Sequence, residues 1–200
     1  MISSNIGSLT NPKKISDTFK SEMNINIASS TIAQYLKYLE ESFIVENAKR
    51  FDIKGRKYIN SPSKYYLSDI GIRNSIINYR QNEESHIMEN IIYLELKKRG
   101  YNVDVGMIED KGRNGKNYTY KQLEVDFIAN KGNNKIYIQS VLSMPDEEKR
   151  KQEERSLVKI NDSFKKFIIT KDYIKTSRDE NGIIIMSIFD FLLDINSLEY

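Results

Sequence analysis

The chain has 200 residues, 39% hydrophobic and 30% charged, a composition that predicts one large or two small folded domains and excludes a disordered chain. It has no cysteine, which excludes disulfides, zinc–thiolate sites and cysteine nucleophiles and makes the cytoplasm the expected location. No apolar stretch approaches the roughly 20 residues that span a bilayer, and the N-terminus lacks the basic and apolar regions of a secretion signal.

The charge is distributed unevenly along the chain. Residues 1–80 carry 12 Lys and Arg against 7 Asp and Glu, a net charge of +5, whereas residues 81–200 carry 19 against 21, a net charge of −2. A basic first part fits a nucleic-acid-binding module joined to something else, and ordinary surface charge is the alternative interpretation.

Two helices are predicted near the N-terminus. Asn11 can cap the first helix, and Pro12 suits its first position, where the missing N–H costs nothing. Ser29 and Ser30 are candidate caps of the second helix. The apolar residues at helical spacing are Ile15, Phe19 and Met23 in the first helix and Ile32, Leu36, Leu39 and Phe43 in the second.

A hairpin with a basic turn is predicted next. Strand is expected over 43–45, 48–53 and 64–67, with a tight turn over 54–57 and a helix over 70–79 capped by Ser68 and Asp69. Helix, turn, helix and hairpin is the layout of a winged helix, in which the second helix recognises DNA and the hairpin is the wing.

The winged-helix interpretation predicts a set of DNA contacts, although a module that only packs between domains remains the alternative. Phosphates would be contacted by Lys37, Arg50, Lys54, Arg56 and Lys57, and base edges by Thr31 and Gln34.

The second half predicts a sheet with helices packed on it. A helix is expected over 83–99 with Gly100 as its C-cap, then a strand over 101–105 and a polar loop over 109–120. The later elements are strands over 123–129, 135–142, 166–170 and 183–186, a charged helix from Pro145 to about 160, and a helix over 189–193. This order indicates an α/β fold.

Three residues of the second half are spaced as in a nuclease motif. Glu89 lies on the predicted helix, Asp126 on a strand and Gln139 on the next strand, which resembles the PD-(D/E)xK pattern. Such sites need hard oxygen ligands for Mg²⁺ or Mn²⁺ and a lysine that acts on the attacking water. Glu89 and Asp126 are the candidate metal ligands. Val141 occupies the lysine position, so we expect a degenerate site unless Lys149 or Lys151 reaches in.

Longer segments resemble one family. The sequences Tyr65-Tyr66-Leu67-Ser68-Asp69-Ile70-Gly71-Ile72-Arg73-Asn74, His86 to Leu96 and Glu124-Val125-Asp126-Phe127 resemble the DUF4143 region of bacterial and archaeal AAA-type ATPases. The resemblance implies a restriction-endonuclease-like second domain and an ATPase core elsewhere in the polypeptide. This chain contains no P-loop sequence, so we expect a fragment or excised domain that lacks the core.

These observations predict two domains, a winged helix over 1–80 and a restriction-endonuclease-like α/β domain over 81–200. The leading hypothesis is a module that binds nucleic acid or docks a partner such as the ATPase core, with DNA as the expected ligand and no resident cofactor. A metal-dependent nuclease using Glu89, Asp126 and Gln139 is the second hypothesis. A purely protein-binding module, with the possibility of a homo-oligomer, is the third.

Overall fold

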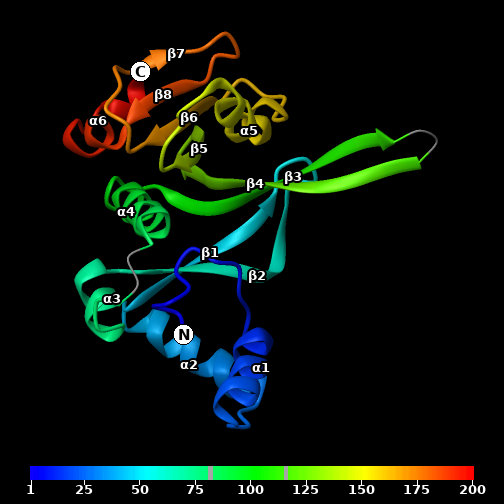
Figure 1. Cartoon of the computed structure of the whole chain (residues 1–200), viewed down its shortest axis with the longest axis vertical. Coiled ribbons are helices and arrows are strands. Elements are labelled where there is room, and N and C mark those ends of the chain that lie inside the picture. The colour runs from blue at the N-terminus through cyan, green and yellow to red at the C-terminus, as the bar shows by residue number, and fades with distance from the viewer. Residues whose placement is uncertain (81–82, 115–116) are drawn as a thin grey trace. The chain divides into compact units, whose positions relative to one another are not determined.

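The computed structural model describes residues 1–80, 83–114 and 117–200, with the backbone alone for 111–114 and 117–118. The fold is mixed α/β, as predicted (Figure 1). Its eight strands form a mixed sheet in the order β2-β1-β3-β4-β5-β6-β8-β7, and the described residues also contain six α-helices and one 3-10 helix. None of these helices combines the length and apolar character that crossing a bilayer requires.

The described residues divide into two compact units. The first comprises Met1–Arg50 and Ile59–Ile91, and the second comprises Phe51–Tyr58 and Ile92–Tyr200. The tip of the first hairpin is therefore part of the second unit, and the first unit continues past residue 80.

The first unit is built from two helices, a strand pair and a short helix. The elements are α1 (Pro12–Met23), α2 (Ser29–Glu41), most of β1 (Val45–Asp52) and β2 (Lys57–Leu67), α3 (Ile70–Ile76) and the first half of α4 (Glu84–Lys98).

Side-chain caps fix two of these helix starts. The Oδ1 atom of Asn11 accepts a hydrogen bond from Lys14 N at 2.8 Å, and Oδ1 of Asp69 accepts one from Ile72 N at 2.7 Å, both as predicted. The prediction that Ser29 or Ser30 caps α2 is wrong, because both lie inside the helix after Ala28, which makes no side-chain cap.

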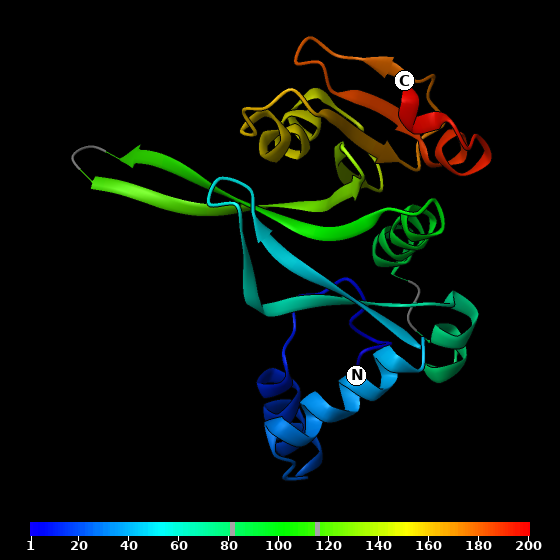
Figure 2. The same cartoon turned by 180° about the vertical axis from the view of Figure 1, so that it is seen from behind.

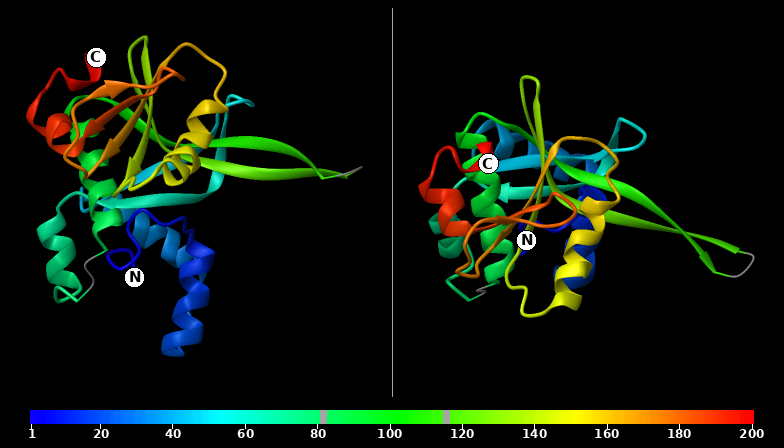
Figure 3. Two further views of the ribbon diagram at one scale, coloured as in Figure 1. Left: turned by 45° about the horizontal axis from the view of Figure 1, so that its top comes forward. Right: turned by 90° about the horizontal axis from the view of Figure 1, so that it is seen from above.

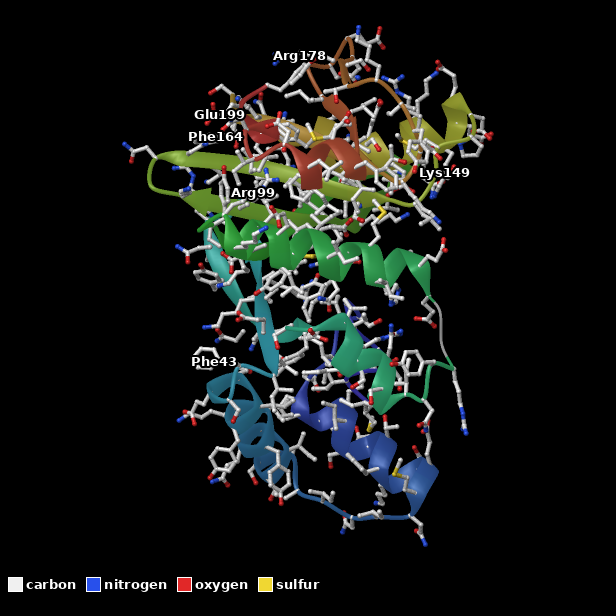
Figure 4. All side chains as sticks on the ribbon, turned by 90° about the vertical axis from the view of Figure 1, so that its left-hand side faces the viewer. Phe43, Arg99, Lys149, Phe164, Arg178 and Glu199 are labelled. Atoms are coloured by element: carbon white, nitrogen blue, oxygen red, sulfur yellow. The ribbon has the colours of Figure 1, made fainter. Side chains whose placement is uncertain are left out.

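The core of the first unit confirms part of each predicted apolar face. Ile15 of α1 and Ile32 and Leu36 of α2 are buried with strand residues in one cluster. Phe43 was expected on the same face as Ile32, but α2 ends before it, and Phe43 is 78% exposed (Figure 4). The helical spacing of apolar residues in the sequence therefore continues beyond the end of α2.

The second unit consists of the hairpin tip, the second half of α4 and all the later strands and helices. Its further elements are β3 (Asn102–Asn114), β4 (Asn117–Lys131), β5 (Asn134–Val141), α5 (Glu147–Val158), β6 (Lys165–Thr170), β7 (Ser177–Arg178), β8 (Ile184–Ser187), α6 (Ile188–Leu193) and the 3-10 helix η1 (Ser197–Glu199). The β3–β4 and β4–β5 pairs are antiparallel, whereas β5, β6 and β8 run parallel.

The predicted loop over 109–120 is wrong, because the described part of this segment is strand. The β3–β4 ladder continues to the pair Asn114↔Asn117, while β4 pairs with β5 only over Phe127–Lys131. Seen from behind in Figure 2, and again in both views of Figure 3, the part of the β3–β4 pair that lies beyond the β4–β5 ladder stands clear of the other described strands of this unit. The segment lacks the apolar alternation that identifies a half-buried strand, so its polar composition favoured a loop.

Gly106 allows three segments of the second unit to meet. It lies at an irregularity of the β3–β4 register, between Asp104 and the continuing ladder. A Cβ atom at Gly106 would lie 2.9 Å from Val125 Cβ and 3.1 Å from both Ile128 Cγ1 and Ile53 Cδ1, so no larger residue fits without displacement.

Arg99, at the end of α4, holds the C-terminal segment of the chain. Its Nε atom donates to Oε1 of Glu95 at 3.0 Å, and its Nη1 atom donates to Oγ of Ser197 at 3.0 Å. The guanidinium also donates to the carbonyl oxygen of Phe191 and lies 4.5 Å from the centre of that ring (Figure 4). One buried cation thus satisfies backbone and side-chain acceptors from α6 to η1.

We expect Arg99→Met to lower the free energy of unfolding by about 3 kcal/mol, because it leaves the buried Glu95 carboxylate without its guanidinium and the carbonyls without donors. Urea denaturation measures this loss. The matched control is Lys98→Met, which removes an exposed cation from the same Glu95 and should cost less than about 1 kcal/mol. Equal losses in the two variants would show that burial of Arg99 is not what matters.

Candidate functional site

The carboxylate of Glu89, a predicted metal ligand, accepts hydrogen bonds from two side chains of the protein. Its Oε1 atom accepts from Lys64 Nζ at 2.8 Å and from the Tyr66 hydroxyl at 2.6 Å. Lys64 and Glu89 are both largely buried, so the pair is a buried ion pair of the first unit. The backbone of Gly7 is also close, since a Cβ there would lie 3.1 Å from Oε1.

The neighbouring residue Asn90 binds the backbone of β2, the strand that carries Lys64 and Tyr66. Its Oδ1 atom accepts from Leu67 N at 2.9 Å, and its Nδ2 atom donates to Leu67 O at 2.8 Å. Glu89 and Asn90 together fasten α4 to β2.

Asp126 and Gln139 come together at the end of the β4–β5 ladder. The last pair is Phe127↔Ile138, and these two residues are the next on each strand. Oδ2 of Asp126 accepts from Ser140 N at 2.9 Å, so the carboxylate closes the ladder. Oε1 of Gln139 accepts a long hydrogen bond of 3.4 Å from Ser156 Oγ on α5.

The position that a nuclease lysine would occupy belongs to the hydrophobic core. Val141 is buried in one cluster with Leu157 and Ile160. Lys149 on α5 (Figure 4) pairs with Glu153, and Lys151 pairs with Glu147. Across the described residues, no group of three or more His, Asp or Glu side chains is placed to hold a metal ion. The predicted Mg²⁺ or Mn²⁺ site therefore gains no support from the geometry.

The exposed side of α2 carries the predicted base-contacting residues. Gln34 is exposed and its Nε2 atom donates to the Tyr38 hydroxyl at 2.5 Å, whereas Thr31 is half-buried. Lys37 forms an exposed pair with Glu41 at 3.5 Å. The helix thus presents a polar side to solvent while Ile32 and Leu36 face the core.

The predicted phosphate-contacting residues of the hairpin differ in exposure. Lys54, Arg56 and Lys57 are exposed on the tip, whereas Arg50 is buried. The tip is a compact turn, in which Oδ1 of Asp52 accepts from Gly55 N at 2.9 Å.

The tip is fixed to β3 of the second unit. Ile53 N donates to Met107 O at 2.9 Å, Lys54 Nζ donates to Glu109 O at 2.8 Å, and the Tyr58 hydroxyl donates to Oδ2 of Asp104 at 3.0 Å.

Arg56 adds charge beside a buried tyrosine. Burial raises the pKa of Tyr137, its hydrogen bond to Asp162 raises it further, and the positive charge of Arg56 opposes this shift. The Arg56 charge therefore acts on the Tyr137 hydroxyl, a group that lies on β5 of the same unit.

Sequence reasoning missed a group of charges where α5 meets the β3–β4 hairpin. Asp110 of β3 accepts from Arg155 Nη2 at 2.6 Å and from Lys159 Nζ at 3.0 Å. These hydrogen bonds, from Lys159 first and then Arg155, lower the pKa of Asp110 below its ordinary value. The sequence carries no local signal for this group, because residues 110 and 155 are far apart in the chain and meet only through the fold.

The chain matches proteins whose function is not described. Residues 1–83 match the model of a family described as "Domain of unknown function (DUF8612)". Over 192 residues the chain is 34% identical to an uncharacterized protein of Haemophilus influenzae. This match covers 96% of this chain and 44% of that protein. Over 140 residues it is 31% identical to an uncharacterized protein of Methanocaldococcus jannaschii, covering 70% of this chain and 29% of that protein. The chain spans less than half the length of either relative.

The predicted membership of the DUF4143 region of AAA-type ATPases is wrong, since the matching family model is a different one. The segments that suggested it have structural tasks in this chain. Tyr66 and Arg73 are buried, Asp69 caps α3, and Asn90 holds the backbone of β2.

We expect Glu89→Ala to lower the free energy of unfolding by about 3 kcal/mol, because it removes the carboxylate that faces the buried Lys64 ammonium. Chemical denaturation measures the loss, and Lys64→Met combined with Glu89→Leu should recover most of it. The exposed pair supplies the control, since Glu41→Ala should cost less than about 1 kcal/mol. A small loss for Glu89→Ala would contradict the structural role given to this carboxylate.

We expect the stabilisation from Asp110 to depend on pH. Because its folded-state pKa is depressed, this stabilisation is complete above the ordinary pKa of 3.8 and is lost as the pH falls through the folded-state value. Asp110→Asn should therefore melt below the wild type at neutral pH, and the difference should narrow toward the lowest pH at which the chain stays folded. Thermal melts across pH measure it, and a difference independent of pH would contradict the ionic origin.

Proposed function

We propose that this chain is a nucleic-acid-binding module that contacts the sugar–phosphate backbone through the basic hairpin tip. The observation that carries the proposal is the exposure of Lys54, Arg56 and Lys57 on a turn that is hydrogen-bonded to β3. A cation held in place loses less conformational entropy when it meets a phosphate than a cation on a flexible segment does.

The electrostatics of the tip support this assignment. Asp52 is the one carboxylate between residues 51 and 58, and one of its oxygens accepts from the Gly55 amide. Phosphate contacts by Lys and Arg provide most of the sequence-independent affinity for nucleic acids, through release of counterions. Arg50 is excluded from the proposed contact set because it is buried.

We further infer that residues 1–80 have the winged-helix order, with α2 as the recognition helix. Helix, turn, helix and two strands follow one another in the chain, and α2 exposes Gln34 and Lys37. The antiparallel β3-β4-β5 strands, helix α5 and parallel β6 are compatible with a restriction-endonuclease-like sheet. Val141 in the core favours binding over cleavage.

The test is a titration of a labelled DNA duplex, followed by fluorescence anisotropy at about 50 mM and about 200 mM salt. We expect binding that weakens steeply with salt, and Arg56→Gln with Lys57→Gln should reduce affinity about tenfold and flatten the salt dependence. Lys151→Gln with Lys175→Gln, which removes two exposed cations of the same unit, is the charge-matched control and should bind as the wild type does.

The same samples, run on a gel with and without Mn²⁺, report cleavage. Intact DNA is the expected result. No binding at either salt concentration would overturn the proposal, and cut DNA that becomes intact with Asp126→Ala would replace it with a metal-dependent nuclease.

Gln34→Ala tests the proposed role of α2. If α2 reads base edges, this variant should reduce discrimination between duplex sequences by about 1–3 kcal/mol while leaving the salt dependence unchanged. Competition titrations with duplexes of different sequence measure it, starting from the best binder of a random pool. An unchanged ranking of the duplexes would assign α2 to packing alone.

A further inference from the structure

Helix α6 of the second unit exposes apolar side chains to solvent. It packs on β6 and β8, near the β7 edge of the sheet (Figure 1). Its residues Ile188 and Phe191 are buried, so one side of the helix already contributes to the core. Phe189 and Leu193 are four residues apart and share another side, on which Leu193 is 86% exposed. Folding of this unit does not explain why that side is apolar.

The segment that leads into β7 extends this apolar side. The Tyr173 ring stacks on the Phe189 ring, with 4.6 Å between the ring centres, and Tyr173 is nevertheless 85% exposed. An open groove of about 570 Å³ adjoins the next residues of this segment, and its apolar lining consists of Ile174, Met186, Leu193 and Tyr200. We name the exposed residues Tyr173, Ile174, Phe189, Leu193 and Tyr200 the α6 surface.

The α6 surface is large for an uncovered apolar patch. At about 200 Å² for each fully exposed large side chain, its five residues expose on the order of 600 Å². A single exposed apolar residue needs no explanation, whereas a contiguous patch of this size marks an interaction site. Two such patches facing each other bury about 1,200 Å², which is the lower limit for specific protein interfaces. The area therefore suffices for a weak but specific contact between two copies of the chain.

The charges beside the α6 surface favour a second copy as the partner. Lys175, Asp190 and Asp194 line the same groove and are exposed. Oδ2 of Asp190 accepts from Thr176 Oγ1 at 3.0 Å, and Oδ1 of Asp194 accepts from Asn196 N at 2.9 Å. Within the part of the chain that the structure describes, none of the three charges belongs to an ion pair. A purely basic partner would be repelled by the lysine and a purely acidic one by the two carboxylates, so the partner needs both signs.

We propose that the α6 surface is a homodimer interface, in which two copies of this chain meet about a two-fold axis. In a two-fold contact, residue i of one copy faces residue j of the other, and j faces i. Lys175 of each copy then faces the Asp190 and Asp194 carboxylates of the other, so both signs are neutralised together. The Leu193 side chains are covered in the same contact. This inference does not rest on the proposed nucleic-acid binding.

The test is sedimentation equilibrium of the full chain without nucleic acid, from about 1 to about 200 µM, the range that suits an interface of this size. We expect a reversible monomer–dimer equilibrium. Leu193→Glu should raise the dimer Kd at least about a hundredfold, because the new charge enters the contact twice. The matched control is Val158→Glu, which adds the same charge at an exposed apolar residue of α5 in the same unit and should dimerise as the wild type does.

Two charge variants test the pairing across the two-fold axis. Lys175→Glu makes the three charges all negative, and Asp190→Lys with Asp194→Lys makes them all positive. Each variant alone should dimerise at least about tenfold more weakly than the wild type, because like charges then face each other. An equimolar mixture of the two should regain wild-type association as a heterodimer. Circular dichroism checks that each variant is folded, and Leu193→Glu carries the test if the double variant is not.

Several outcomes overturn the inference. A wild type that stays monomeric over this concentration range has no such interface, and its α6 surface then belongs to a different partner. A dimer that survives Leu193→Glu forms through another surface. Species that grow beyond the dimer indicate a head-to-tail contact instead of a two-fold one. Charge variants that do not associate when mixed contradict the pairing of Lys175 with the two carboxylates.

Discussion

The close approach at Gly106 is the constraint on which the surface of the second unit depends. Val125 of β4 and Ile53 of the hairpin tip both lie within about 3 Å of the place where a Cβ would stand. The same residue therefore lets the tip lie on β3 and lets β4 pair closely with β3 beyond the irregularity in their register. Because glycine alone fits there, the position of the tip and the β3–β4 pairing share one steric requirement.

Buried charge explains why counting charges along the sequence was a poor guide to the surface. Residues 1–80 have a net charge of +5, but Arg50, Lys64 and Arg73 are buried in the first unit. Lys54, Arg56 and Lys57 belong to the second unit. The positive charge of this segment is thus divided between buried positions of the first unit and the exposed hairpin tip, which belongs to the second unit.

The sequence predicted most of the elements that local interactions determine. Asn11, Asp69 and Asp146 each accept a hydrogen bond from the backbone three residues later, and Gly100 ends α4 with a positive φ. These signals need no knowledge of distant residues. The mixed α/β class followed from them, because the helical and strand segments alternate through the second half.

Features that depend on distant partners could not be predicted in the same way. Glu89 resembles a metal ligand in the sequence, and its role becomes visible only when β2 places Lys64 and Tyr66 beside it. The segment over 109–120 has the composition of a loop, and pairing between β3 and β4 makes it strand. In the candidate site, the exposed tip residues were predicted, whereas Asp110 and its two partners from α5 were not.

The path of the chain between the two units limits where it can be cut without disrupting either of them. The chain passes between the two units three times, after Arg50, after Tyr58 and within α4 after Ile91. A single protease cut therefore cannot release either unit intact. A shorter chain that stopped at residue 80 would keep Lys64 but lack Glu89, and its hairpin tip would lack the β3 backbone that accepts from Ile53 and Lys54. Each unit is compact in space but discontinuous in sequence, so neither unit corresponds to one uninterrupted stretch of this chain.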